Sequence, residues 1–309
     1  MASIVFQASQ LVDRIGQNPK TKKEISTQTR KVYKKHTINF FRWCQKTYGS
    51  EKVSKRKKHI PDYVEYLKNQ KKSASTIHTY VAAICRAFHV PMDQIQEKPT
   101  RRTSENTRSR GVKKSDSRKD TKREASPRLY DLAEVVGVRR NEYKRLRRDD
   151  IVTDESGYIC VRIKQGKGGK YQEQRILPED EEFVKNYFDG TQGFVFSKNE
   201  MNNKIDLHHL RELQAQRAYI YYTRQLEQNP KYHEQLKAEV KARWLKHNSH
   251  PWDPRCVEGQ YTIRGGNRSF AKEHGLPVSY DRLAVMAVSV FHLAHWRCDV
   301  TVDNYLLAI

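Results

Sequence analysis

The sequence has few cysteines and no long apolar run, and each absence excludes a class of protein. Only five cysteines occur among 309 residues. They are scattered, odd in number and free of any Cys-x-x-Cys pair, which argues against a disulfide scaffold and against a thiolate metal site. No stretch approaches the roughly 18 apolar residues of a membrane helix, and residues 1–20 lack the apolar segment of a signal peptide. We therefore expect a protein of a reducing compartment without a membrane span.

Acidic residues are scarce relative to basic ones. The chain has 59 Lys and Arg against 36 Asp and Glu, which gives a formal net charge of +23. Such a surplus favours a polyanionic partner, because every phosphate that a cation neutralises releases counterions. Hydrophobic residues still make up 37% of the chain, which is enough for folded cores and excludes a disordered polycation. We expect nucleic acid as the partner and no membrane, since no amphipathic helix offers an apolar insertion face.

Composition and periodicity divide the chain into four parts. Residues 1–20 show no periodicity and are predicted to be an N-terminal extension. Residues 21–97 are predicted to form a small helical domain. Residues 98–127 are rich in Lys, Arg, Ser and Thr and poor in large apolar residues, so we expect a basic linker. Residues 128–309 are predicted to form the second domain.

Three helices are predicted in the small domain. The first covers residues 27–48, where apolar side chains recur at helical spacing. The second begins at Pro61, since proline is favoured in the first helical turn. The third begins after a serine cap, Ser73 or Ser75, and runs to Phe88.

The second domain is predicted to combine helices with a β-hairpin. Residues 158–163 and 171–177 alternate as strands do, and residues 165–170 form the turn between them. Helical patterns cover residues 129–146, 207–226, 232–247, 263–274 and 277–292. The whole chain is thus expected to be mainly α, with a small antiparallel β-sheet.

Three candidate functional residues stand in the first half of the second domain. Arg139 lies three residues before Glu142, so the two share a helix face and can form an ion pair. The turn at residues 165–170 presents Lys167 among glycines, on a tip that can reach a partner's groove. This turn is not a phosphate-binding loop of the nucleotide-hydrolase type, because the Ser or Thr after Gly-Lys and the following helix are missing.

Further candidates lie near the end of the chain. Tyr261 precedes Arg264 by three residues, and Trp296 precedes Tyr305 by nine. His295, the neighbour of Trp296, is ten residues from Tyr305. The adjacent His208 and His209 are not expected to hold a metal, since neighbouring residues of a helix do not face one site.

In this order, the residues resemble the tyrosine recombinase (phage integrase) family. The family's frame is an Arg, a hairpin Lys, a His-x-x-Arg motif, a His or Trp, and a Tyr. The resemblance implies a helical core-binding domain and an α+β catalytic domain that form a clamp on DNA. It departs from the frame where a tyrosine stands in place of the motif's histidine. The implied catalytic residues are Arg139, Lys167, Tyr261, Arg264, Trp296 and Tyr305, with Glu142 and His295 in support.

The resemblance implies a site-specific recombinase or integrase of a mobile genetic element. Such an enzyme cuts and rejoins double-stranded DNA through a covalent 3′-phosphotyrosyl intermediate, without metal, ATP or other cofactor. It would act as a homo-tetramer on two paired DNA sites and associate weakly when free of DNA. It would lie in the cytoplasm of a bacterium, with the nucleoid, or in a nucleus if viral or eukaryotic. Expected DNA contacts are Lys31, Lys34, Lys35, Arg101, Arg102, Lys113 and Lys114.

Two alternatives stay open at this point. The same residues suit a telomere resolvase or a type IB topoisomerase, which do not pair two sites. The chain could also be a DNA-binding protein that kept the fold without catalysis.

Overall fold

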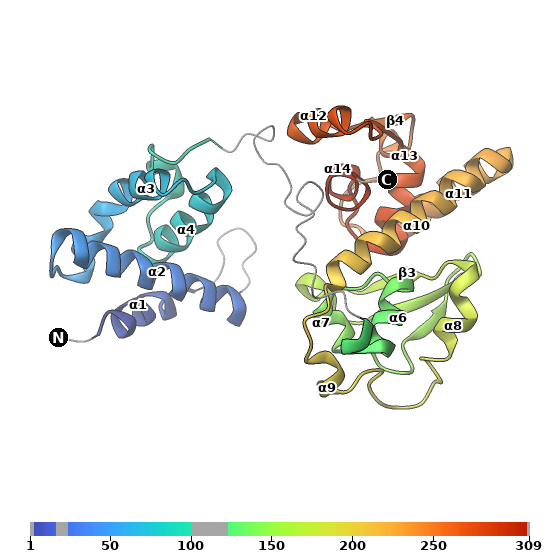
Figure 1. The fold of residues 1–309 in the computed structure, drawn as a ribbon, viewed down its shortest axis with the longest axis horizontal. Helices are drawn as coiled ribbons and strands as arrows, with labels where there is room; N and C mark the ends of the chain where they lie inside the picture. The colour runs from blue at the N-terminus through green and yellow to red at the C-terminus, as the bar shows by residue number, and fades with distance from the viewer. Residues whose placement is uncertain (1–2, 17–23, 101–122, 308–309) are drawn as a thin grey trace. The chain divides into compact units, whose positions relative to one another are not determined.

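The computed structural model describes residues 3–16, 24–100 and 123–307, and the chain divides into two compact units, residues 1–102 and 103–309 (Figure 1). The fold is mainly helical with two small antiparallel sheets, as the sequence predicted. No helix within these ranges is long and apolar enough to cross a membrane.

The first unit is a bundle of four α-helices with two 3₁₀ segments, the second of which is Met92–Gln94. Its helices begin after serine caps in three cases, because a serine hydroxyl accepts a hydrogen bond from a free N–H of the first turn. The elements are α1 (Ile4–Asp13), α2 (Thr27–Tyr48), the 3₁₀ segment Val53–His59, α3 (Ile60–Asn69) and α4 (Ala74–Ala87). The helices predicted at residues 27–48, from Pro61 and after Ser73 are confirmed.

Helix α1 corrects the prediction of an extension without periodicity. Ala8 and Val12 are fully buried, in the packing of α1 against α2. Two ion pairs add to this contact, from Lys34 (2.7 Å) and Arg30 (3.7 Å) to Asp13. The apolar residues of this segment recur at spacings of three and four, which is the helical period that the sequence analysis overlooked.

The second unit combines two β-sheets with helices. Its α-helices are α6 (Pro127–Val135), α7 (Arg140–Tyr143), α8 (Glu181–Lys185), α9 (Lys198–Met201), α10 (Leu207–Gln228), α11 (Pro230–His247), α12 (Gly265–Glu273), α13 (Arg282–Ala287) and α14 (Cys298–Thr301). The strands are β1 (Ile151–Thr153), β2 (Ile159–Ile163), β3 (Gln172–Arg175), β4 (Gln260–Thr262) and β5 (Ser279–Asp281). Two π-helical segments, Val288–Leu293 and Val302–Leu306, follow α13 and α14.

The predicted β-hairpin is present. Strands β1, β2 and β3 form an antiparallel sheet in that order, and Ile163 pairs with Gln172 as the last strand pair before the β2–β3 turn. The Gly166 N–H donates to the Lys170 carbonyl at 2.7 Å and closes the turn. A Cβ atom at Gly166 would lie 1.9 Å from the Gln172 amide nitrogen, so only glycine fits there without a shift of that side chain.

The helix predicted over residues 129–146 is instead two helices with a short non-helical stretch between them. Helix α6 ends at Val135; Val136 and Arg139 have extended backbone, and between them the Val138 N–H donates to the Val136 carbonyl at 2.9 Å and closes a tight turn at Gly137. The β-branched Val136 and Val138 favour extended backbone. Gly137 between them lies so close to α10 that an added Cβ would be 2.6 Å from the Gln214 side-chain oxygen.

Helices α10 and α11 contribute to a large hydrophobic core cluster of the second unit. Ala215, Ala218 and Tyr222 of α10 and Leu236 of α11 pack in one cluster with Phe291. These helices therefore belong to the body of the unit.

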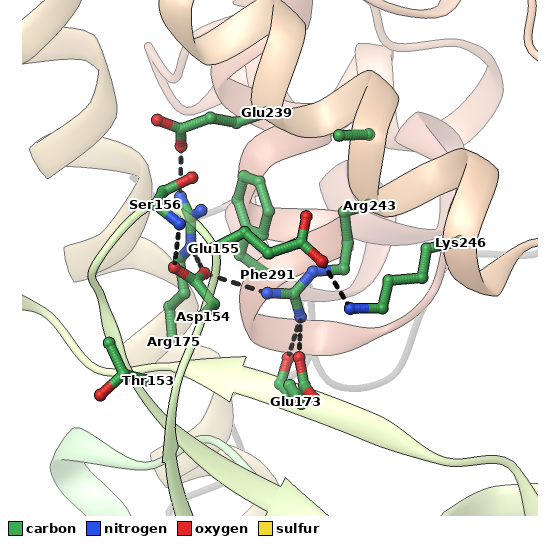
Figure 2. A pocket seen from close by; sticks show the side chains of 11 residues that line it. Thr153, Asp154, Glu155, Ser156, Glu173, Arg175, Glu239, Arg243, Lys246 and Phe291 are labelled. Carbon is green, nitrogen blue, oxygen red and sulfur yellow. Dashed lines mark hydrogen bonds and ion pairs between the residues drawn. The ribbon is translucent and has the colours of Figure 1, made fainter.

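A buried ion network ties α11 to the three-stranded sheet (Figure 2). The Arg175 guanidinium at the end of β3 binds Asp154 at 2.6 Å and Glu239 of α11 at 2.7 Å. Arg243 of α11 binds the same Asp154 at 3.0 Å. Burial alone would raise the pKa of Asp154, but the Arg175 charge holds it below its ordinary value. Because these groups are nearly inaccessible to solvent, loss of one partner would leave an unpaired buried charge, which costs about 3–5 kcal/mol.

Candidate active site

Tyr305 lies where several distant segments of the second unit converge. It belongs to the π-helical segment Val302–Leu306 and is only 3% exposed. The imidazole centroids of His295 and His208 lie 5.1 and 5.4 Å from the centroid of the phenol ring. The Arg211 guanidinium carbon lies 5.7 Å from the same centroid. One phenol is thus surrounded by two imidazoles and a guanidinium.

Arg211 is held rigidly at this place. Its side chain is fully buried, and its guanidinium donates to the carbonyl oxygens of Gly137 and Leu293, the latter at 2.7 Å. These carbonyls come from the non-helical stretch before α7 and from the π-helix before His295. Burial lowers the pKa of Arg211 from its ordinary value, and the nearby Arg139 adds to this effect. The fixed fork geometry of a guanidinium suits it to bind two oxygens of one anion.

Arg139 and Glu142 form the second charged group of the site. The Glu142 carboxylate accepts hydrogen bonds from the Arg139 guanidinium at 2.8 Å and from the Arg139 backbone N–H at 2.7 Å. Glu142 is 3% exposed, whereas the Arg139 side chain is 24% exposed. The buried carboxylate therefore holds the Arg139 side chain in place, while part of the guanidinium stays open to a ligand.

Lys167 approaches from the exposed tip of the β2–β3 hairpin. The tip is a short 3₁₀ turn, Lys167–Gly169, in which Gly168 and Gly169 have φ angles of 77° and 75°. Such angles are strained for residues with a side chain, which accounts for the glycines. The lysine charge is near enough to His295 to contribute to lowering the pKa of that imidazole.

His295 is a neutral imidazole in a strongly positive surrounding. Burial lowers its pKa to about 2, and the charges of Arg211, Arg139, His208 and Lys167 act in the same direction. Its Nδ1 atom is buried and has no hydrogen-bond partner among the described residues. An imidazole in this state can donate or accept a hydrogen bond but does not carry charge.

We use the name Tyr305 site for the set formed by Arg139, Glu142, Lys167, His208, Arg211, His295 and Tyr305. Its three cations, Arg139, Lys167 and Arg211, outnumber its single carboxylate. Preorganised donors around a phenol can bind a tetrahedral anion and stabilise charge that develops on it during attack by the phenol oxygen. Among the residues that the structure describes, no group of His, Cys, Asp and Glu is arranged to hold a metal ion.

The structure separates the sequence-predicted catalytic residues into two sets. Five of the eight residues, counting the two supporting ones, lie in the Tyr305 site: Arg139, Glu142, Lys167, His295 and Tyr305. Three others do not join it by any ring contact, ion pair or hydrogen bond between described side chains: Tyr261, Arg264 and Trp296.

Each of these three has a different environment. The Trp296 ring packs edge-on against Trp244 of α11, with centroids 5.9 Å apart. Tyr261 lies in β4 under the Arg282 guanidinium at 5.7 Å, and burial raises its pKa to about 12. Arg264 precedes α12 and is exposed.

His208 and Arg211 are the residues that the sequence analysis missed. They stand three apart in the first turns of α10, so both face Tyr305. Asp206 caps this helix by accepting the N–H of His208 at 3.1 Å, which fixes the first turn. Their signal in the sequence is a His-x-x-Arg spacing between the hairpin lysine and His295, although the resemblance placed that motif at Tyr261 and Arg264.

The structure covers three of the residues predicted to contact DNA. Lys31 and Lys35 are exposed on α2, whereas Lys34 is occupied by its ion pair with Asp13. The other four lie outside the described residues: Arg101, Arg102, Lys113 and Lys114.

Comparison with protein families and with curated proteins identified no relative of this chain. No protein-family model matches the chain, and no curated protein matches it. A functional conclusion therefore depends on the chemistry of the Tyr305 site and on the order of its residues along the chain.

Proposed function

We propose that this protein is a site-specific tyrosine recombinase or integrase of a mobile genetic element, with Tyr305 as its nucleophile. The observation that carries the proposal is the contact of two histidines and Arg211 with the Tyr305 phenol, with the charges of Arg139 and the hairpin lysine close to His295. Their order along the chain is Arg139, Lys167, His208, Arg211, His295 and Tyr305. That order is the recombinase frame with its His-x-x-Arg motif complete.

This proposal revises three residue assignments made from the sequence. Arg211 takes the role of second arginine in place of Arg264, and His208 takes the histidine position in place of Tyr261. His295 takes the position given to Trp296. The support for each change is contact with Tyr305.

In the proposed reaction, the Tyr305 oxygen attacks a phosphorus atom of the DNA backbone. A bond forms between that oxygen and phosphorus, and the bond from phosphorus to the 5′-oxygen breaks. The products are a 3′-phosphotyrosyl link and a free 5′-hydroxyl, so the energy of the broken ester is retained and no ATP is required. The Arg139 and Arg211 guanidinium groups stabilise the negative charge that grows on the non-bridging oxygens.

Two proton transfers complete the proposed step. His208 receives the proton of the Tyr305 hydroxyl, since the lowered pKa of His295 leaves that imidazole a weak base. Lys167 gives a proton to the departing 5′-oxygen, because an alkoxide is a poor leaving group without one. His295 then donates a hydrogen bond to the phosphate. The negative charge of the phosphate offsets the positive charges that surround the His295 ring.

We further propose double-stranded DNA as the substrate and a tetramer on two paired sites as the working assembly. A net charge of +23 supports a DNA partner, and the exposed Lys31 and Lys35 of α2 are available for phosphate contacts. In this proposal the first unit is the core-binding domain and the second is the catalytic domain.

A suicide DNA substrate tests the proposal. A nick placed just beyond the cleavage site lets the short 5′-product diffuse away, so the covalent protein–DNA adduct accumulates and migrates slowly on a denaturing gel. The wild-type protein and Tyr261→Phe should form the adduct, and Tyr305→Phe should not, although its DNA affinity stays nearly unchanged. An adduct with Tyr305→Phe, or none with the wild type on its own site, would contradict the proposal.

The same assay separates the alternatives. Strand exchange between two sites identifies a recombinase, whereas supercoil relaxation or hairpin formation without exchange identifies a topoisomerase or a telomere resolvase.

A further inference from the structure

The second unit carries a surface groove that the proposed chemistry does not use. It is a cavity of about 630 Å³ between the start of α6, the stretch after α7 and helix α9. Its apolar lining includes Phe196, Met201 and Phe194, which is 57% exposed and thereby the most exposed aromatic side chain of the described residues. An exposed aromatic surface within a concave site marks a place where an apolar group binds.

The rim of this groove is positively charged. Four cations line it, Arg128, Lys144, Arg148 and Lys198, against one carboxylate, Glu200. Arg128 is paired with Glu200 at 2.7 Å and Arg148 with Asp189 at 3.1 Å. Lys144 and Lys198 are exposed and have no ion-pair partner among the described side chains. The groove therefore suits a segment that carries both an aromatic side chain and carboxylates.

Such a segment lies on the same unit, at residues 179–183. Glu179, Asp180, Glu181 and Glu182 precede Phe183, which is 38% exposed. The Glu182 side chain is 91% exposed, although Lys185 binds it at 2.8 Å. Arg217 binds both Glu179 and the buried Asp180 at 3.0 Å, so the carboxylates that this segment offers to a partner are those of Glu181 and Glu182.

The acidic segment and the groove are neighbours on one surface. The Phe183 and Tyr187 ring centroids are 5.3 Å apart, and those of Tyr187 and Phe196 are 6.3 Å apart. Arg128 lies 5.7 Å from both the Tyr187 and the Phe196 rings. Adjacent surfaces of complementary charge and shape permit a two-fold arrangement, in which each copy gives its segment and receives that of its partner.

We propose that two copies of the protein associate through reciprocal docking of residues 179–183 into this groove. Phe183 of one copy packs on Phe194 of the other, and Glu181 and Glu182 meet the ammonium groups of Lys144 and Lys198. At about 0.15 M salt, screening acts beyond roughly 8 Å, so the general repulsion between two basic chains weakens while close ion pairs persist. The proposal does not depend on the chemistry assigned to Tyr305.

Charge exchange between the two surfaces tests this interface with the full-length chain. The dimer dissociation constant is measured by analytical ultracentrifugation in about 0.15 M salt. Lys144→Glu/Lys198→Glu and Glu181→Lys/Glu182→Lys should each raise that constant at least tenfold, because like charges then meet twice in each dimer. A one-to-one mixture of the two variants should associate about as tightly as the wild type, since both contacts of the mixed dimer again join opposite charges.

Controls keep the result interpretable. Thermal unfolding checks that the exposed substitutions leave the fold intact, and Phe183→Ser should weaken association without any change of charge. A monomeric wild type, variants that associate as the wild type does, or a mixture that fails to restore association would each overturn the proposal. So would a loss of DNA affinity in Lys144→Glu/Lys198→Glu with association unchanged, which would assign the groove to nucleic acid.

Discussion

The His295 imidazole lies against the Tyr305 phenol, with ring centroids 5.1 Å apart and ring planes inclined by 52°. Its neighbour Trp296 is turned toward Trp244 of α11 instead. Two adjacent residues thus have separate roles: one belongs to the Tyr305 site, and the other packs on the helical core.

Substitution of these neighbours should give different kinetic results. His295→Ala removes the hydrogen bond to the bound phosphate and should slow single-turnover cleavage on the order of a hundredfold. Trp296→Phe keeps an aromatic ring against Trp244 and should change the cleavage rate little. Equal rates in wild type and His295→Ala, together with a large loss in Trp296→Phe, would return the assignment to Trp296.

The two candidate arginines can be compared in the same way. Arg211→Ala should slow adduct formation by a hundredfold or more, since loss of one preorganised donor to developing charge costs about 3 kcal/mol. Arg264→Ala, at an exposed position, should leave the single-turnover rate close to that of the wild type. Because Arg211 is fully buried, Arg211→Lys serves as a second variant, which keeps the charge but loses the fork. A slow Arg264→Ala beside a fast, folded Arg211→Lys would refute the revised assignment.

The general-acid role proposed for Lys167 predicts rescue by a better leaving group. Lys167→Ala should cleave ordinary DNA very slowly, because the departing 5′-alkoxide requires a proton. When sulfur replaces the bridging 5′-oxygen, the leaving thiol has a pKa of about 8.5, so a thiolate departs largely without help. The variant should then approach the wild-type rate on the sulfur substrate.

Two variants serve as controls for this experiment. Lys170→Ala, in the same turn, should behave like the wild type on both substrates. Arg139→Ala should be rescued much less, because Arg139 acts on the non-bridging oxygens. Failure of sulfur to rescue Lys167→Ala would show that the lysine acts in binding or in charge stabilisation.

Buried His292 predicts a specific loss of stability in acid. Its ring nitrogens are hydrogen-bonded to Gln214 at 2.9 Å and to Tyr222 at 3.1 Å. Burial lowers its pKa to about 3, with the Arg175 and Arg211 charges acting in the same direction. The unfolded chain takes up this proton near pH 6.5 and the folded chain only near pH 3, so the histidine's contribution is complete above pH 6.5 and falls as the pH drops between these values.

Denaturant unfolding measured between pH 7 and pH 4 checks this effect. The free energy of unfolding of the wild type should fall more steeply than that of His292→Gln, by up to about 1.4 kcal/mol per pH unit. Parallel curves for the two proteins would show that His292 titrates normally in the folded state. Comparison of slopes makes the result independent of any general destabilisation by the substitution.

Local signals in the sequence were sufficient for most elements and for part of the site. The helix over residues 27–48 and the β2–β3 hairpin could be predicted because periodicity, serine caps and turn glycines act locally. The break between α6 and α7 could not, since it depends on the close approach of Gly137 to Gln214, far away in the chain.

The residue assignments that the proposal introduces could not have been made from the sequence either, and the reasons are physical. Arg211 lies on a helix whose place in the core becomes apparent only in three dimensions, and nothing local distinguishes it from a surface arginine. The choice of Trp296 followed a spacing of nine residues to the tyrosine. The structure instead brings His295, ten residues away, against Tyr305, and the chain between them passes through left-handed backbone at Trp296 (φ 62°), which residue spacing alone does not reveal.

The burial of Tyr305 has a consequence for how the protein would behave when it contacts DNA outside its target site. Tyr305 is 3% exposed and Arg211 is fully buried. A duplex bound at the protein surface therefore contacts neither the Tyr305 hydroxyl nor the Arg211 guanidinium. Under the proposed function, non-specific binding along a chromosome therefore does not lead to strand cleavage. Cleavage then requires a conformational change that displaces the segment Val302–Leu306 and exposes Tyr305. The packing of this one short segment thereby limits cleavage at unintended sites.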